Sequence, residues 1–193
     1  MININVPDGK SGEWEVSSFK VKEREFSQVL SYFKTGRSVP GGIYKRLLRN
    51  KQVVMSNTPD EIRDFRYFLN QAEGNILING LGIGVLVKAL IQKENVQAIT
   101  IIENSKDVIR LSGPTYSSNP KVTIIHADCF TWQSPKGKRY NAVWHDIWDT
   151  ISSDNLEEMK KLHRKYGRKA DYQESWCRDI CENQRKEEKQ YFY

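Results

Sequence analysis

Three glycines follow directly after an apolar segment near the middle of the sequence. The segment is 75–79, and Gly80, Gly82 and Gly84 stand at alternate positions ahead of a second apolar stretch, 85–91. Glycine lets a strand turn sharply into a helix, and a turn without side chains lets a ligand lie against the backbone. The free N–H groups at the start of the following helix would face the same place. The spacing predicts a cradle of nucleotide size, or else glycines that serve only tight packing.

Acidic side chains follow three later apolar segments. Glu103 ends the first of these, Asp128 and Cys129 follow the second, and Asp146 and Asp149 follow the third. Ligands of open parallel sheets bind at the carboxyl ends of the strands, so these side chains are expected to converge on one crevice. A carboxylate about twenty residues after such glycines is typical of a ribose-binding position. Each of these acids has an alternative role as a cap of the helix that follows it.

The fold that would position these residues is a Rossmann-like α/β fold. We predict a mostly parallel sheet flanked by helices, with an N-terminal β-hairpin and a helical C-terminus. The expected strands of the sheet are 75–79, 98–103, 122–126 and 141–145. A single domain of residues 1–193 is predicted. It comprises a hairpin and helix (1–51), a core that binds the ligand (52–150) and C-terminal helices (151–193).

Local patterns predict the remaining elements. Short alternating segments at 2–6 and 13–21 suggest the hairpin, and apolar residues at helical spacing indicate a helix over 22–35. Thr58, followed by proline and two acids, is typical of a helix start. Two charged helices are expected near the C-terminus, over 155–166 and 172–190.

The order of these motifs resembles the class I S-adenosylmethionine-dependent methyltransferase fold. Within it, the Asp146-x-x-Asp149 pair and the segment 56–67 are similar to the spermidine-synthase branch. The resemblance covers roughly residues 52–150. Because a full sheet of this family has seven strands, the chain is expected to be truncated after the fourth.

The resemblance also implies roles for the site residues. The three glycines would lie beneath the methionine part of the cofactor, with Glu103 on the ribose, Asp128 on the adenine amine and Cys129 beside it. Asp146 would lie near the reacting centre, where it would orient or deprotonate an acceptor, and Asp149 would be a second carboxylate.

Three functions follow as alternatives. The first is methyl transfer from S-adenosylmethionine to an unknown acceptor. The second is aminopropyl transfer from decarboxylated S-adenosylmethionine, since paired carboxylates suit a cationic amine. The third is a non-catalytic module that binds the cofactor or nucleic acid.

Charge and composition bear on partners. The chain has a formal net charge of +6, and segments 34–51 and 160–169 each hold six basic residues. Both segments are either solvated faces or contacts for nucleic-acid phosphates, and Tyr44 and Tyr166 lie within them as candidates for base stacking. A second copy of the chain is an alternative partner, in a homodimer formed through the N-terminal hairpin or the C-terminal helices.

The three cysteines are read as reduced apolar residues. The Cys177-x-x-x-Cys181 spacing has no nearby histidine or cysteine partner, so no metal site is expected. No apolar run reaches the roughly 18 residues of a membrane-spanning helix, and the first residues lack the pattern of a signal peptide. These observations predict a cytoplasmic protein without a membrane segment.

Overall fold

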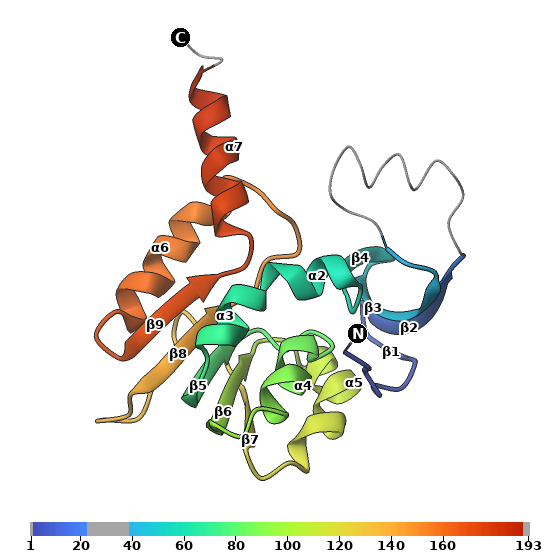
Figure 1. Cartoon of the computed structure of the whole chain (residues 1–193), viewed down its shortest axis with the longest axis horizontal. Coiled ribbons are helices and arrows are strands. Elements are labelled where there is room, and N and C mark those ends of the chain that lie inside the picture. The colour runs from blue at the N-terminus through green and yellow to red at the C-terminus, as the bar shows by residue number, and fades with distance from the viewer. Residues whose placement is uncertain (1, 23–38, 191–193) are drawn as a thin grey trace.

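A five-stranded parallel sheet forms the centre of the structure, a computed structural model that describes residues 2–22 and 39–190 (Figure 1). The strands lie in the order β7-β6-β5-β8-β9, and every neighbouring pair is parallel. Their bounds are β5 (Gly74–Asn79), β6 (Val96–Glu103), β7 (Val122–His126), β8 (Tyr140–His145) and β9 (Ala170–Ser175). The chain leaves β5 toward β6 on one side and later returns to β8 on the other. This reversal creates the switch point at which open α/β sheets bind ligands.

Helices cover both faces of this sheet. Side chains alternate across β5, so Ile76 and Ile78 enter one apolar core while Leu77 enters the other. The first core also contains side chains of α3, α4 and α5, and the second contains the apolar side of α6. The helices are α2 (Pro59–Asp64), α3 (Arg66–Gln71), α4 (Val85–Ile91), α5 (Lys106–Ser117), α6 (Asn155–Tyr166) and α7 (Arg178–Gln190).

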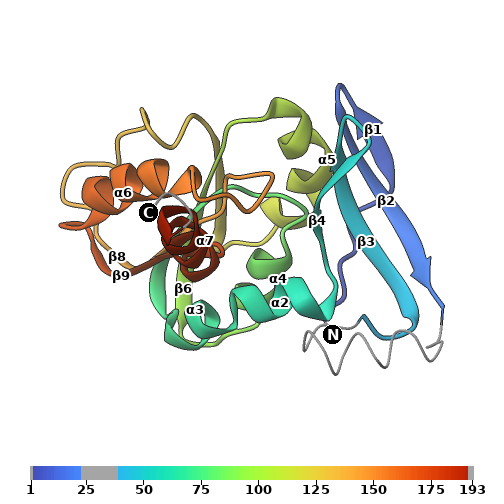
Figure 2. The ribbon, with the colours of Figure 1, turned by 90° about the horizontal axis from the view of Figure 1, so that it is seen from above.

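A second, antiparallel sheet stands beside α5 (Figure 2). Its strands, in order, are β1 (Gly9–Ser11), β2 (Trp14–Val21), β3 (Gly42–Arg49) and β4 (Gln52–Ser56). The Ser11 hydroxyl donates a hydrogen bond to the Asp107 carboxylate of α5 over 2.6 Å. The N-terminal segment inserts Ile4 and Val6 into the first apolar core, and these contacts fix the sheet against the parallel one.

The predicted Rossmann-like α/β fold is confirmed, and several element predictions need correction. The parallel sheet does not end after its fourth strand, because residues 170–175 form β9 where a helix was expected. The hairpin pairs residues 9–11, not 2–6, with β2 and is part of the larger antiparallel sheet, which continues past residue 51 through β4.

The helix that follows Thr58 is divided at Phe65 into α2 and α3, and the Thr58 side chain makes no capping hydrogen bond. The helix predicted over 22–35 lies almost entirely outside the described residues. In the described parts of the chain, no helix combines the length and the apolar character needed to cross a membrane.

Candidate functional site

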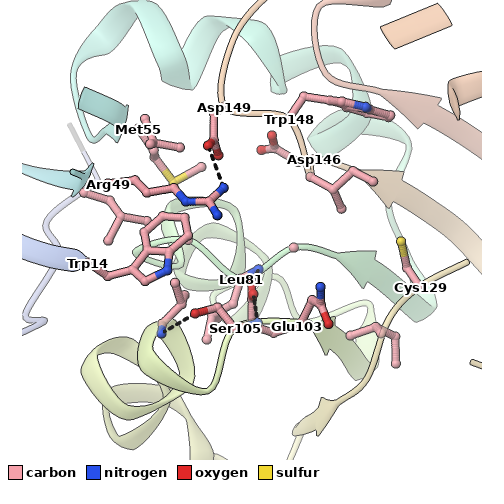
Figure 3. A pocket seen from close by; sticks show the side chains of 18 of the residues that line it. Trp14, Arg49, Met55, Leu81, Glu103, Ser105, Cys129, Asp146, Trp148 and Asp149 are labelled. Carbon is pink, nitrogen blue, oxygen red and sulfur yellow. Dashed lines mark hydrogen bonds and ion pairs between the residues drawn. The ribbon is translucent and has the colours of Figure 1, made fainter. Parts of the chain in front are cut away.

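A cleft of about 530 Å³ opens at the carboxyl ends of β5, β6, β7 and β8. This volume lies within the range of small-molecule sites. The antiparallel sheet supplies the opposite wall, through Trp14, Leu47, Arg49 and Met55 (Figure 3). The sequence-predicted residues that line the cleft are Gly80, Gly82, Glu103, Asp128, Cys129, Asp146 and Asp149.

The three glycines have different structural roles. All have a positive φ, which non-glycine residues rarely adopt. A Cβ on Gly80 would overlap the backbone oxygen of Asp146, and one on Gly82 would overlap the Met55 sulfur at the cleft wall. Gly84 does not line the cleft, and a Cβ there would overlap the buried ring of Tyr116. Gly84 therefore allows α4 and α5 to approach each other, whereas Gly80 and Gly82 shape the cleft.

Glu103 is held by two backbone N–H groups. Its Oε2 accepts from Leu81 over 2.8 Å, and its Oε1 accepts from Ser105 over 2.8 Å. Burial raises the pKa of this carboxyl, and the N–H donors oppose that shift. The side-chain cap of α5 is the Ser105 hydroxyl, which accepts from Val108. Glu103 therefore braces the turn after β5 against the turn after β6, with its carboxylate at the cleft surface.

The loop after β7 forms the far end of the cleft. Asp128 Oδ1 accepts a hydrogen bond from the Phe130 backbone over 2.7 Å, which shapes the loop. Cys129 is buried, and burial together with the Asp128 charge raises the pKa of its thiol to about 12. Lys165 of α6 donates to the backbone oxygens of Cys129, Phe130 and Trp132, so this lysine holds the loop in place.

Asp146 and Asp149 differ in their surroundings. Asp146 follows β8 and is partly enclosed, and burial raises the pKa of its carboxyl to about 7 even though Trp144 donates to it over 3.5 Å. Asp149 pairs with Arg49 of β3, with 3.1 Å between Oδ2 and Nη1 (Figure 3). Of these two carboxylates, Asp146 has no basic partner in the described part of the chain, and Asp149 has a cation beside it.

Glu61 also lines the cleft, and the sequence reasoning did not single it out. Its Oε1 accepts from the Ser56 backbone over 2.6 Å. Burial raises the pKa of Glu61 to about 8, and the Asp146 and Asp64 carboxylates add to that shift. In the sequence Glu61 looks like an ordinary acid in the first turn of a helix. Only the return of β8 to the same edge brings it near Asp146.

The predicted stacking residues do not offer a free ring. Tyr44 and Tyr166 are both buried, at 1% and 0% exposure, so neither ring presents a face to a base. Within the two basic segments, Lys45 pairs with Asp8, Arg49 pairs with two acids, and Lys165 binds backbone oxygens. The exposed cations of α6 include Lys160, Lys161 and Arg164.

Comparison with known proteins gives partial likenesses. No family model matches the chain. It is similar to polyamine aminopropyltransferase 1 of Streptomyces coelicolor, with 28% identity over 121 residues, 56% of this chain and 23% of that protein. Among solved structures, the CcbJ methyltransferase from Streptomyces caelestis shares 16% identity at a TM-score of 0.45, over 58% of this chain and 45% of that one.

An S-adenosylmethionine-dependent methyltransferase from Clostridium acetobutylicum shares 14% identity at a TM-score of 0.42. The match covers 57% of this chain and 44% of that one. The chain thus spans less than a quarter of the curated relative and under half of each of these two structures. Its own strand order and cleft define it as a Rossmann-like α/β protein with a nucleotide-sized site at the strand ends.

Proposed function

We propose that the cleft binds S-adenosylmethionine or a close analogue, and that the protein transfers the methyl group to an acceptor. One observation carries this proposal: residues that follow the ends of four parallel strands, from Gly80 to Asp149, line one cleft. They include a glycine turn, a braced carboxylate and a second carboxylate, Asp128, in the half-buried loop after β7. This is the arrangement in which α/β sheets hold adenosine-containing ligands.

The residues present suit such a cofactor. Glu103 has lone pairs beyond those used by Leu81 and Ser105, so its carboxylate can accept from ribose hydroxyls. Asp128 uses Oδ1 for Phe130, and a carboxylate in this loop can accept from an exocyclic amine. Gly80 and Gly82 line the cleft without side chains of their own, so the remainder of the cofactor can lie along this turn.

The charge of the cleft favours a cationic ligand. Its lining includes seven carboxyl groups and two basic side chains. The cofactor, when bound, supplies an activated methyl group on a positively charged sulfonium. Asp146 is the residue that we assign to the acceptor, because it lies after β8 without a basic partner among the described residues. A pKa of about 7 suits a group that takes a proton from an amine near neutral pH.

Aminopropyl transfer is the second candidate function. The partial similarity to polyamine aminopropyltransferase 1 favours it, and so do the acidic side chains near Asp146. The same cleft would then take decarboxylated S-adenosylmethionine. The two functions differ in which form of the cofactor binds more tightly.

Calorimetric titration tests both functions. S-adenosylmethionine, its decarboxylated form and S-adenosylhomocysteine would be titrated into the wild-type protein, Glu103→Ala and the matched control Glu94→Ala, whose side chain is exposed away from the cleft. Loss of two braces and the ribose contact should weaken binding in Glu103→Ala by about 100-fold, as expected for hydrogen bonds to a charged group. Preference for the intact form supports methyl transfer. Binding of none of the three would contradict the cofactor proposal.

Partners and location are separate proposals. We infer that the acceptor is a small or macromolecular amine, that the exposed cations of α6 are the part of the surface suited to nucleic acid, and that the protein acts in the cytoplasm. The homodimer also stays a prediction. Lys160→Glu combined with Lys161→Glu should abolish any binding of a short single-stranded RNA at low salt.

A further inference from the structure

Arg49 reaches into the cleft from the end of β3 (Figure 3). Its Nε donates to Glu13 over 2.8 Å and its Nη1 donates to Asp149 over 3.1 Å. The guanidinium also lies over the Trp14 ring, 5.2 Å from its centroid. Three groups, two from the β1–β2 hairpin and one from the loop after β8, therefore hold one cation at the cleft wall.

Glu13, one partner of Arg49, is itself held in place. The second oxygen of Glu13 accepts from the Asn50 side chain over 2.9 Å, so the hairpin turn holds this carboxylate in place. Arg49 and Asp149 are separated by 100 positions in the sequence, and their side chains are 44% and 37% exposed. A pair that is partly desolvated and supported by an aromatic ring is more persistent than a fully exposed one.

The Arg49–Asp149 pair makes Asp149 different from the other carboxyl groups at the acceptor end of the cleft. Asp146 has no basic partner among the described residues, and Asp149 already has a guanidinium on its Oδ2. Glu61 accepts from the Ser56 backbone, and burial raises its pKa to about 8, so it is mostly uncharged near neutral pH and does not supply a second carboxylate. A linear diamine needs a carboxylate for each of its two ammonium groups. A second ammonium placed at Asp149 would meet the Arg49 charge and would have to displace it from Asp149.

We propose that Arg49 is a specificity-determining residue that excludes dicationic acceptors by occupying Asp149. The inference rests on the proposed function and narrows it, because it favours an acceptor with a single amine over a diamine. Rejection through an opposing charge is a general route to specificity. Arg49 therefore favours methyl transfer over aminopropyl transfer to a polyamine in this cleft.

The test is calorimetric titration with putrescine at low ionic strength, without cofactor. Arg49→Gln removes the cation beside Asp149 and leaves that carboxylate free to bind an ammonium group. The double variant, Arg49→Gln with Asp149→Asn, removes the carboxylate as well. Arg46→Gln is the matched control, since Arg46 lies on the same strand, bonds Ser17 and does not line the cleft. Arg49→Gln should bind putrescine about tenfold more tightly than the wild type, from loss of the competing charge.

The control variants each have an expected affinity for putrescine. Arg46→Gln should match the wild type, the double variant should lose the gain, and Arg49→Lys should still exclude putrescine because it keeps a cation beside Asp149. The proposal is overturned if the wild type binds putrescine as tightly as Arg49→Gln, if Arg49→Gln gains nothing, or if the double variant keeps the gain. The titration does not require the cofactor, so failure to bind S-adenosylmethionine would count against the proposed function alone.

Discussion

The carboxyl groups of the cleft are distinguished by what each one contacts. Glu103 accepts two backbone N–H bonds, and Asp149 has Arg49. Glu61 lies near the Asp146 charge, and Asp146 lies near the charges of Asp64 and Glu103. Burial raises the pKa of Glu61 and Asp146 into the neutral range. A cationic ligand would lower both pKa values, since it stabilises the ionised forms.

Glu61 gives a prediction for stability as a function of pH. Its pKa in the folded protein, about 8, lies above its ordinary value of 4.5. The folded state therefore holds a proton that the unfolded state has lost, so the contribution of this group is complete below pH 4.5 and is lost as the pH rises through 8. Glu61→Gln should raise the Tm by a few degrees at pH 8.5 and leave it nearly unchanged at pH 5.

Thermal unfolding followed by circular dichroism at the two pH values measures this difference. Glutamine keeps an oxygen that can accept from Ser56, so the variant removes the titration and preserves the hydrogen bond. The exposed Glu94 provides the control, Glu94→Gln, for a general effect of charge. An equal change in Tm at both pH values would show that Glu61 does not titrate between them.

At the scale of elements, the short turn after β5 both lines the cleft and packs against helix α5. Gly82 faces the cleft, and Gly84 lies against Tyr116, whose hydroxyl donates to the Ile83 backbone over 2.7 Å. The alternate spacing predicted a ligand cradle from both glycines, and the resemblance to the methyltransferase fold placed both beneath the cofactor. Gly84 packs against Tyr116 of α5, a helix more than twenty residues later in the sequence. The pattern of residues around the turn therefore could not show which glycine faces the cleft and which faces the core.

Gly84→Ala tests whether Gly84 is required for packing against Tyr116. The new methyl group would overlap the Tyr116 ring and φ is +70°, so we expect a loss of about 3 kcal/mol or more in unfolding free energy. Gly137→Ala is the matched control: φ there is +79° and a Cβ would meet nothing within 4 Å, so about 1 kcal/mol should be lost. Chemical denaturation measures both, and equal losses would contradict the packing role of Gly84.

The sequence predicted the buried strands better than the exposed ones. Strands β5, β6 and β8 have long apolar runs because both of their faces are covered. Strand β9, by contrast, is an edge strand of mainly polar residues, Ala-Asp-Tyr-Gln-Glu-Ser, and its structure depends on pairing with β8. No local apolar pattern marks it, so charged neighbours made the segment look helical.

At the scale of the whole molecule, the cleft lies between two sheets. The sequence located the wall formed by the parallel strands, because each site residue follows an apolar segment. The opposite wall, with Trp14, Arg49 and Met55, has no comparable local signal. The Arg49–Asp149 pair in particular depends on how the antiparallel sheet rests on α5 through contacts such as Ser11–Asp107.

A ligand in this cleft should therefore protect both sheets at once. With saturating S-adenosylhomocysteine, hydrogen exchange should slow about tenfold or more in residues 47–56 of the antiparallel sheet and in the turns at 80–82 and 103–108, since binding suppresses local opening. Helix α7 serves as the internal reference, because it points away from the body of the molecule and none of its residues lines the cleft (Figure 1). Mass spectrometry of peptides from exchanged protein measures all four regions together. Protection confined to the two turns would mean that the ligand contacts the parallel sheet alone, and Arg49 would then lie too far from it to influence the choice of acceptor.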